Sequence, residues 1–175
     1  NGIAQACAVA GIGAVMVDVA EVALAKGMAA IAGSLERLVK KDKLSVADRD
    51  AAVARVRTST DYAALGGVDL VIEAATENPS IKFEILRRAD GIANPDAILA
   101  TNTSSISITQ LAAVTKRPDR FLGMHFFNPV PMMALVELIR GLQTSDATVA
   151  LAESFATRLG KTPIVVKNSP GFVVN

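Results

Sequence analysis

Cysteine is nearly absent from this sequence, since Cys7 is the only one among 175 residues. A disulfide framework or a zinc cluster within one chain is therefore excluded. This cysteine usage is compatible with a reducing compartment, and we expect a cytoplasmic protein. Long apolar runs are also missing, because charged residues or glycines interrupt each run well before the roughly 18 residues of a membrane span. No secretory signal is recognisable, so we expect no membrane as partner.

Neither sign of charge dominates the chain. It carries 18 Lys and Arg against 17 Asp and Glu, which leaves a net charge of +1. This balance disfavours nucleic acid as the main partner. One local basic cluster comprises Arg37, Lys40, Lys41 and Lys43. Cations near a helix C-terminus can complement the helix dipole, or they can hold a phosphate-bearing ligand.

Short apolar segments alternate with amphipathic ones along the chain, which is long enough for one domain with a core. The apolar segments predict strands over residues 14–18, 68–75, 97–101, 121–126, 134–140 and 163–167. The others predict helices over residues 2–10, 20–40, 46–55, 79–92, 107–114 and 145–159. This alternation predicts an α/β fold with a mainly parallel sheet, in which ligands bind at the carboxyl ends of the strands.

Asp18 ends the first predicted strand, after a helix that stops at Gly11 and Gly13. In dinucleotide-binding folds an acid at this place accepts hydrogen bonds from the adenosine ribose, and it favours NAD over NADP. Asp18 is equally placed to cap the helix over residues 20–40. The glycine-rich phosphate turn that would separate the two interpretations would lie before Asn1.

His125 is the only histidine of the chain and ends an apolar strand. A lone histidine among apolar residues is more often a core side chain than a catalyst. Asn128, Pro129 and Pro131 follow it, and such residues disfavour a continued strand. His125 is therefore predicted to lie at a strand–loop junction, where this fold places its chemistry.

Glu137 lies within a strand whose two faces are both largely apolar. A buried carboxylate is costly unless it is paired or hydrogen-bonded. An imidazole is a natural partner, because a carboxylate fixes the ring tautomer and stabilises the imidazolium. The alternative is an ion pair with Arg140 or another base.

Short polar side chains follow the strand over residues 97–101, in the segment Thr101-Asn102-Thr103-Ser104-Ser105. Such a cluster can bind ligand oxygens or cap the next helix. Ser104 has no base near it in the sequence, so a nucleophilic role is unsupported. Glu73 and Glu77 bracket the end of another strand, and Lys82 lies about one turn inside the helix that follows.

Taken together, these stretches resemble the 3-hydroxyacyl-CoA dehydrogenase family over essentially the whole chain. The most specific match is the block from His125 to Pro131 with Leu135-Val136-Glu137 beyond it. Further matches are Asn1-Gly2-Ile3-Ala4-Gln5, Val71-Ile72-Glu73-Ala74, Glu77-Asn78, Asn102-Thr103-Ser104-Ser105, Gly160-Lys161 and Pro170-Gly171-Phe172-Val173-Val174-Asn175. Within this family, the sequence most resembles short-chain bacterial 3-hydroxybutyryl-CoA dehydrogenases.

The resemblance implies a Rossmann-like, doubly wound domain with a helical arm, NAD as cofactor and acyl-CoA as substrate. It implies a catalytic dyad of His125 and Glu137, helped by Ser104 and Asn175, which also bind substrate. The cofactor-binding residues that it implies are Asp18, Glu77, Lys82, Asn102 and Asn128. Ser34 and Lys41 match coenzyme A contacts on the arm.

The family also sets expectations beyond these residues. The first strand and most of the phosphate-binding glycines would precede Asn1, so we expect residues 1–175 to be an NAD-binding domain that is incomplete at its N-terminus. A helical dimerisation domain is expected after Asn175, and with it a homodimer. Two alternatives to the acyl-CoA activity stay open: another hydroxy-acid dehydrogenase, such as one for L-gulonate, and a non-catalytic relative of the crystallin kind.

Overall fold

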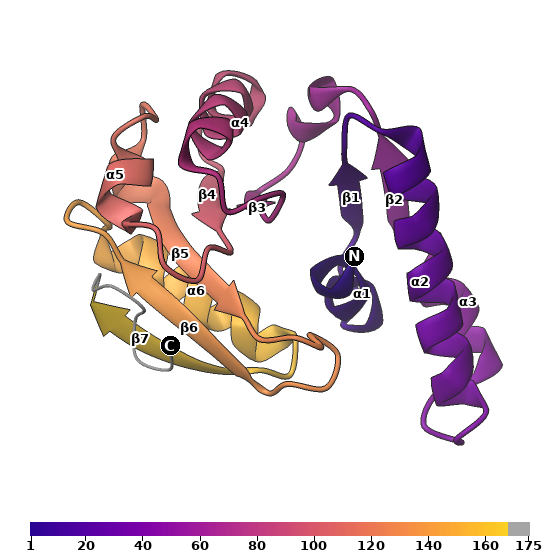
Figure 1. The fold of residues 1–175 in the computed structure, drawn as a ribbon. Helices are drawn as coiled ribbons and strands as arrows, with labels where there is room; N and C mark the ends of the chain where they lie inside the picture. The colour runs from indigo at the N-terminus through magenta and orange to yellow at the C-terminus, as the bar shows by residue number, and fades with distance from the viewer. Residues whose placement is uncertain (168–175) are drawn as a thin grey trace. The chain divides into compact units, whose positions relative to one another are not determined.

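The computed structural model describes residues 1–167 and divides the chain into two compact units (Figure 1). The first unit comprises residues 1–64 and 128–133, and the described part of the second comprises residues 65–127 and 134–167. A 3-10 turn at Tyr62–Leu65 lies where the chain passes from one unit to the other.

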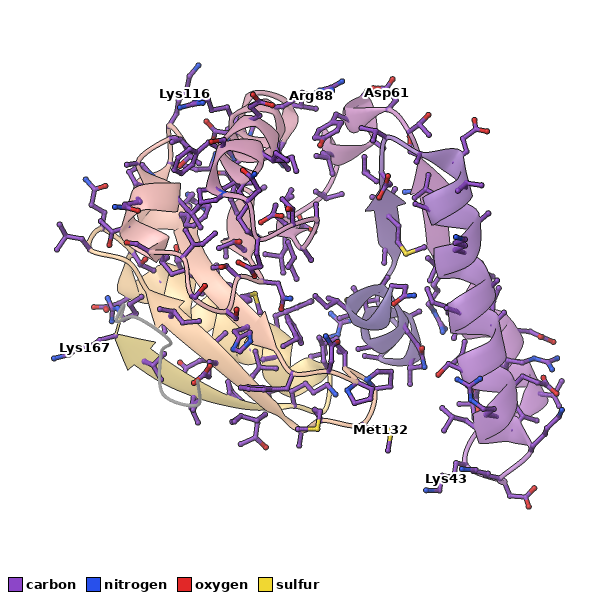
Figure 2. All side chains as sticks on the ribbon, in the orientation of Figure 1. Lys43, Asp61, Arg88, Lys116, Met132 and Lys167 are labelled. Atoms are coloured by element: carbon purple, nitrogen blue, oxygen red, sulfur yellow. The ribbon has the colours of Figure 1, made fainter. Side chains whose placement is uncertain are left out.

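The first unit is built on two parallel strands, β1 (Ala14–Val17) and β2 (Val56–Ser59). Three helices belong to it: α1 (Gly2–Val9), α2 (Glu21–Val39) and α3 (Val46–Ala54). Helices α2 and α3 lie side by side as the expected arm, and Lys43 lies in the turn between them (Figures 1 and 2). Their apolar faces close on one core, formed by Ala8, Ile31, Leu35, Ala52 and Val56.

Strand β2 was not predicted from the sequence. Only Val56 is buried in it, whereas Arg57 and Thr58 are exposed. A single inward side chain gives no apolar alternation, so the pairing with β1 is a tertiary constraint that four residues do not encode alone.

The second unit contains a five-stranded sheet in the order β3-β4-β5-β6-β7. Its strands are β3 (Leu70–Glu73), β4 (Ile98–Thr101), β5 (Phe121–Phe126), β6 (Leu135–Arg140) and β7 (Thr162–Lys167). All neighbours are parallel except β5 and β6, which run antiparallel. The segment between β5 and β6 is too short for the crossover that a parallel pair requires. The expectation of a mainly parallel sheet is therefore confirmed.

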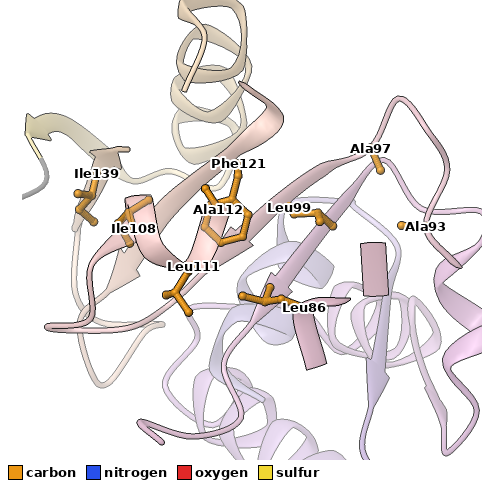
Figure 3. Packing of buried hydrophobic residues seen from close by; sticks show 9 residues of the cluster. All are labelled: Leu86, Ala93, Ala97, Leu99, Ile108, Leu111, Ala112, Phe121 and Ile139. Carbon is orange, nitrogen blue, oxygen red and sulfur yellow. The ribbon is translucent and has the colours of Figure 1, made fainter. Parts of the chain in front are cut away.

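Helices cover both faces of this sheet (Figure 1). Helices α4 (Pro79–Ile92) and α5 (Ile108–Ala112) pack on one face, and α6 (Asp146–Arg158) packs against β5, β6 and β7 from the other. Figure 3 shows the core under α4 and α5, which comprises Leu86, Ala93, Ala97, Leu99, Ile108, Leu111, Ala112, Phe121 and Ile139.

Side chains alternate between the two faces along each strand. Phe121 and Ile139 face α5, so Gly123, His125 and Glu137 share that face. Helix α5 packs closely on the sheet at Gly123, because a Cβ there would lie 2.8 Å from Ile108 Cδ1 and 3.0 Å from Ile139 Cβ.

We therefore predict that Gly123→Ala destabilises the chain by about 1–3 kcal/mol, through overpacking between α5 and β6. Gly91 is the matched control, since it lies in α4 and an added Cβ there meets nothing within 4 Å. Gly91→Ala is expected to stabilise by about 0.5–1 kcal/mol, because alanine has the better helix propensity. Urea unfolding of both variants checks this pair, and a neutral Gly123→Ala would contradict the close approach.

Cys7 lies buried in α1, and this burial raises the pKa of its thiol from 9.0 to about 11. The folded state thus favours the neutral thiol. Its contribution to stability is present below the unfolded pKa and is lost as pH rises through the window between these two values. At about pH 8.5, iodoacetamide should leave native Cys7 unmodified and alkylate it once denaturant is added. Equal rates with and without denaturant would contradict the burial.

Candidate active site

His125 and Glu137 form a buried pair where β5 and β6 face each other. The antiparallel register places them directly opposite, and residues opposite each other share one face of a sheet. His125 Nδ1 lies 2.8 Å from Glu137 Oε2. Their side chains are 10% and 0% exposed, so the carboxylate is fully withdrawn from solvent. Of the partners left open for Glu137, the imidazole of His125 is thus the one that binds it.

Arg140, the other partner weighed for Glu137, lies elsewhere. Its guanidinium binds Asp146 at 2.7 Å and donates to the carbonyl oxygen of Thr144. Glu137 therefore has the imidazole, and not Arg140, as its hydrogen-bond partner. A carboxylate can only accept a hydrogen bond, so this contact with an ionised Glu137 requires the proton of the neutral ring on Nδ1.

The imidazole also has an aromatic neighbour. The rings of His125 and Phe127 lie 4.5 Å apart between centroids, at an interplanar angle of 54°. This contact comes from the residue that follows β5. His125 is consequently restrained by Glu137 at one ring nitrogen and by Phe127 against the ring.

Asn102 follows β4 directly and binds the backbone beside His125. Its Oδ1 accepts a hydrogen bond of 2.8 Å from the main-chain N–H of Phe126. Its own N–H donates to the carbonyl oxygen of Glu73, also at 2.8 Å. Asn102 therefore joins the carboxyl ends of β3 and β5.

Glu77 binds the loop that carries Ser104. Thr103 donates its hydroxyl to Glu77 Oε2 at 2.7 Å, and the N–H of Ser104 donates to Oε1 at 3.2 Å. Both carboxylate oxygens thus hold consecutive residues of one loop. Helix α5 is capped by Ser107, which accepts from the N–H of Gln110. Thr103 accepts from the N–H of Ile106 and so holds the turn before this helix.

Glu73 and Lys82 form a second buried ion pair, which sequence reasoning did not recognise. Lys82 Nζ lies 2.6 Å from Glu73 Oε2, and both side chains are 1% exposed. Thr101 donates its hydroxyl to the same carboxylate oxygen at 2.8 Å. The N–H of Ala75 donates to Oε1. Lys82 was expected to contact a cofactor, and its ammonium group here binds the helix α4 to the ends of β3 and β4.

The remaining predicted site residues are not among the described residues of the second unit. Asp18, Ser34, Lys41 and Asn128 lie in the first unit, and Asn175 lies outside the described residues. Ser34 accepts a hydrogen bond from Gln5 Nε2 at 2.9 Å. Lys41 is exposed.

Asp18 is exposed at the end of β1, and its Oδ1 accepts from the N–H of Ala20. Ala20 itself is the N-cap of α2, so Asp18 holds the turn before the helix. An open cavity of about 460 Å³ lies in the same unit, lined by Glu21, Leu24, Ala25, Met28, Thr58, Ser59 and Thr60. The N–H of Asp18 donates to the carbonyl oxygen of Ser59, which also lines the cavity. The acid and the cavity therefore lie at the carboxyl ends of the two parallel strands.

The described part of the chain has neither a metal-binding cluster nor a membrane-spanning helix. Residues 1–167 contain no cluster of three or more His, Cys, Asp or Glu side chains that could hold a metal ion. Over the same range, no helix has both the length and the apolar character to cross a membrane.

Removing one partner of the buried Glu73–Lys82 pair leaves the other charge uncompensated. We predict that Lys82→Met destabilises the chain by about 3–5 kcal/mol, and that adding Glu73→Leu recovers most of this loss. Asp50→Ala, which removes an exposed partner of Arg49, should cost less than about 1 kcal/mol. Denaturant unfolding of the three variants measures the coupling, and additive losses in the double variant would contradict a paired interaction.

The chain is similar to proteins of one family. Residues 1–169 match the family described as 3-hydroxyacyl-CoA dehydrogenase, NAD binding domain. The fatty acid oxidation complex subunit alpha of Acinetobacter baylyi is 48% identical over 175 residues, which are 100% of this chain and 24% of that protein. The chain thus spans about a quarter of the length of such relatives.

Solved structures show the same likeness. The (S)-3-hydroxybutyryl-CoA dehydrogenase PaaH1 of Ralstonia eutropha is 63% identical, with a TM-score of 0.98 over 99% of this chain and 62% of that one. FadB2 of M. tuberculosis is 45% identical, with a TM-score of 0.96 and the same two shares. Both similarities extend over nearly all of this chain and under two thirds of the other.

Proposed function

Since this chain belongs to the 3-hydroxyacyl-CoA dehydrogenase family and matches its NAD-binding domain, we propose that the protein oxidises 3-hydroxyacyl-CoA to 3-ketoacyl-CoA and catalyses the reverse reduction. The observation that carries this proposal is the bond between His125 and Glu137. A general base that is buried, oriented and charge-compensated suits removal of a proton from a hydroxyl group.

The residues of the first unit fit the cofactor that the family implies. Asp18 presents an exposed carboxylate at the end of a parallel strand, which suits the adenosine ribose hydroxyls. The cavity beside it is bounded by the apolar side chains of Leu24 and Met28 and the hydroxyls of Thr58 and Thr60. We propose Asp18 as the ribose ligand. The chemistry that NAD supplies when bound is acceptance of a hydride from the substrate carbon.

In oxidation, His125 takes the proton of the substrate 3-hydroxyl at Nε2, while Nδ1 stays bound to Glu137. The imidazolium that forms is stabilised by the Glu137 carboxylate 2.8 Å away. In reduction, the same nitrogen returns the proton to the 3-keto oxygen. Burial of the pair strengthens this electrostatic stabilisation, because little water screens it.

Other polar groups are proposed to place the reactants. Glu77 holds the loop of Ser104, so we assign Ser104 to the substrate oxygens and Glu77 to the cofactor side of that loop. Asn128 and Asn175 are proposed as further polar groups around the reacting centre, and Lys82 as a residue near the cofactor. Ser34 and Lys41 are proposed to contact the coenzyme A part of the substrate.

The substrate is proposed to be short, such as 3-hydroxybutyryl-CoA, and the protein to act in fatty acid or related acyl-CoA metabolism. Support comes from relatives with these names: the 63% identical dehydrogenase of Ralstonia eutropha and a 3-hydroxybutyryl-CoA dehydrogenase of Escherichia coli, which is 38% identical. We also propose a cytoplasmic homodimer that pairs through a helical domain following this one.

We predict that His125→Gln in the full-length protein lowers kcat by about 10²–10⁴-fold, the range of general acid–base catalysis, and leaves the Kd for NADH nearly unchanged. Glu137→Gln should lower kcat as well and displace its pH dependence, since the neutral amide no longer compensates the imidazolium. Steady-state kinetics with acetoacetyl-CoA and longer ketoacyl-CoAs measure both effects and the chain-length preference.

Glu153→Gln is the control for charge removal, because Glu153 lies on α6, on the other face of the sheet. It should behave as the unaltered protein. Near-normal turnover of His125→Gln would sink the assignment of the base. Turnover of gulonate in preference to acetoacetyl-CoA would replace the acyl-CoA substrate by a hydroxy acid.

A further inference from the structure

We propose that Asn102 is a positioning residue for His125: its side-chain oxygen continues the pairing of β4 with β5 after the two main chains part, and so holds the end of β5. The inference rests on the proposed acid–base role of His125. It assigns to Asn102 a backbone-holding role in place of the cofactor contact expected from the sequence.

The main-chain pairing between β4 and β5 ends before His125. Its register runs from Leu99 opposite Phe121 to Thr101 opposite Gly123. The main-chain N–H of the next residue, Asn102, donates to the carbonyl oxygen of Glu73 and so continues the pairing of β4 with β3. Among residues 1–167, His125 and Phe126 therefore lie on a part of β5 whose main-chain partner is β6 alone.

The side chain of Asn102 supplies the acceptor that β4 no longer provides. Phe126 is 3% exposed, so water does not replace a lost partner of its N–H. A buried donor without an acceptor costs about 1–3 kcal/mol. The bond from this N–H to Asn102 Oδ1, at 2.8 Å, removes that cost and fixes where the strand ends.

This bond acts on His125 because the donor nitrogen belongs to the peptide group between His125 and Phe126. Holding that peptide plane, together with the pairing of His125 to β6, restricts the backbone rotation that sets the direction of the Cα–Cβ bond of His125. Glu137 fixes the ring at Nδ1, and Phe127 lies against the ring. Because backbone and ring are both held, Nε2 points in one fixed direction before any substrate binds. A displacement of about 1 Å in such a group can cost about 100-fold in rate.

The two roles for Asn102 use different atoms. A positioning role uses Oδ1, which accepts from Phe126, whereas a donated contact to a cofactor would use Nδ2. Asn102→Asp keeps an acceptor of the same shape and removes the two N–H donors of the amide. Asn102→Ala removes the acceptor as well as the donors. The aspartate variant consequently separates the roles.

Thr144 offers a matched control at the opposite end of β5. Its Oγ1 donates to the carbonyl oxygen of Phe121 at 2.7 Å, and this hydroxyl is also buried. Thr144→Ala removes one side-chain bond to the same strand, four residues away from His125. It should lower stability and leave the geometry of the base intact.

The experiment measures kcat, KM and NADH Kd for the full-length protein and its Asn102→Ala, Asn102→Asp and Thr144→Ala variants. We expect Asn102→Ala to lose about 10-fold to about 100-fold in kcat with NADH Kd within about twofold. Asn102→Asp should recover most of kcat, and Thr144→Ala should keep it. Hydrogen exchange should show lost protection of the Phe126 amide in Asn102→Ala alone.

Three results would overturn the proposal: unchanged kcat in Asn102→Ala, an NADH Kd that rises in step with the loss of kcat, or an equal kcat loss in Thr144→Ala. If Asn102→Ala does not fold, Asn102→Asp decides, since a kcat and NADH Kd near those of the unaltered protein support the positioning role and a tenfold loss in either contradicts it. An active His125→Gln would instead overturn the proposed function, which keeps the two failures distinguishable.

Discussion

The second unit depends on one hydrogen bond, that between His125 Nδ1 and Glu137 Oε2. A carboxylate that is 0% exposed is costly in a protein unless it is paired or hydrogen-bonded, and the imidazole opposite it supplies a hydrogen bond. The antiparallel register of β5 and β6 sets the two residues face to face. A shift of one residue in that register would turn one of the two side chains to the opposite face of the sheet, so strand pairing and chemistry are specified together.

The rest of the sheet supports that bond from several sides. Close packing of α5 at Gly123 holds β5 two residues before His125, and Asn102 holds it one residue after. The second buried pair, Glu73 with Lys82, binds α4 to the strand ends from which Asn102 projects. These contacts keep a polar centre rigid within an otherwise apolar sheet, as preorganised acid–base catalysis requires.

Much of this was predictable from the sequence, and the physical reason differs between elements. Strands β5 and β6 are apolar on both faces, so burial indicated that Glu137 needs a partner. Burial and strand phase left His125 and Arg140 open as that partner, and the family resemblance favoured His125. Strand β2 was missed because Val56 is its only buried side chain. The Glu73–Lys82 pair joins a strand to a helix, and the bond of Asn102 reaches a main-chain N–H 24 residues away. Neither contact leaves a local pattern, since each exists only once the sheet has formed.

The tautomer of His125 tests the central claim most directly. Residues 1–175 contain one histidine, so ¹⁵N-histidine labelling of the protein, with His125→Gln to identify the signals, gives a single imidazole to follow. The account predicts that, in the neutral ring, Nδ1 carries the proton and Nε2 the lone pair, and that Glu137→Gln changes this pattern. A neutral ring protonated at Nε2 would contradict the account, because that nitrogen could not then remove a proton from the substrate hydroxyl.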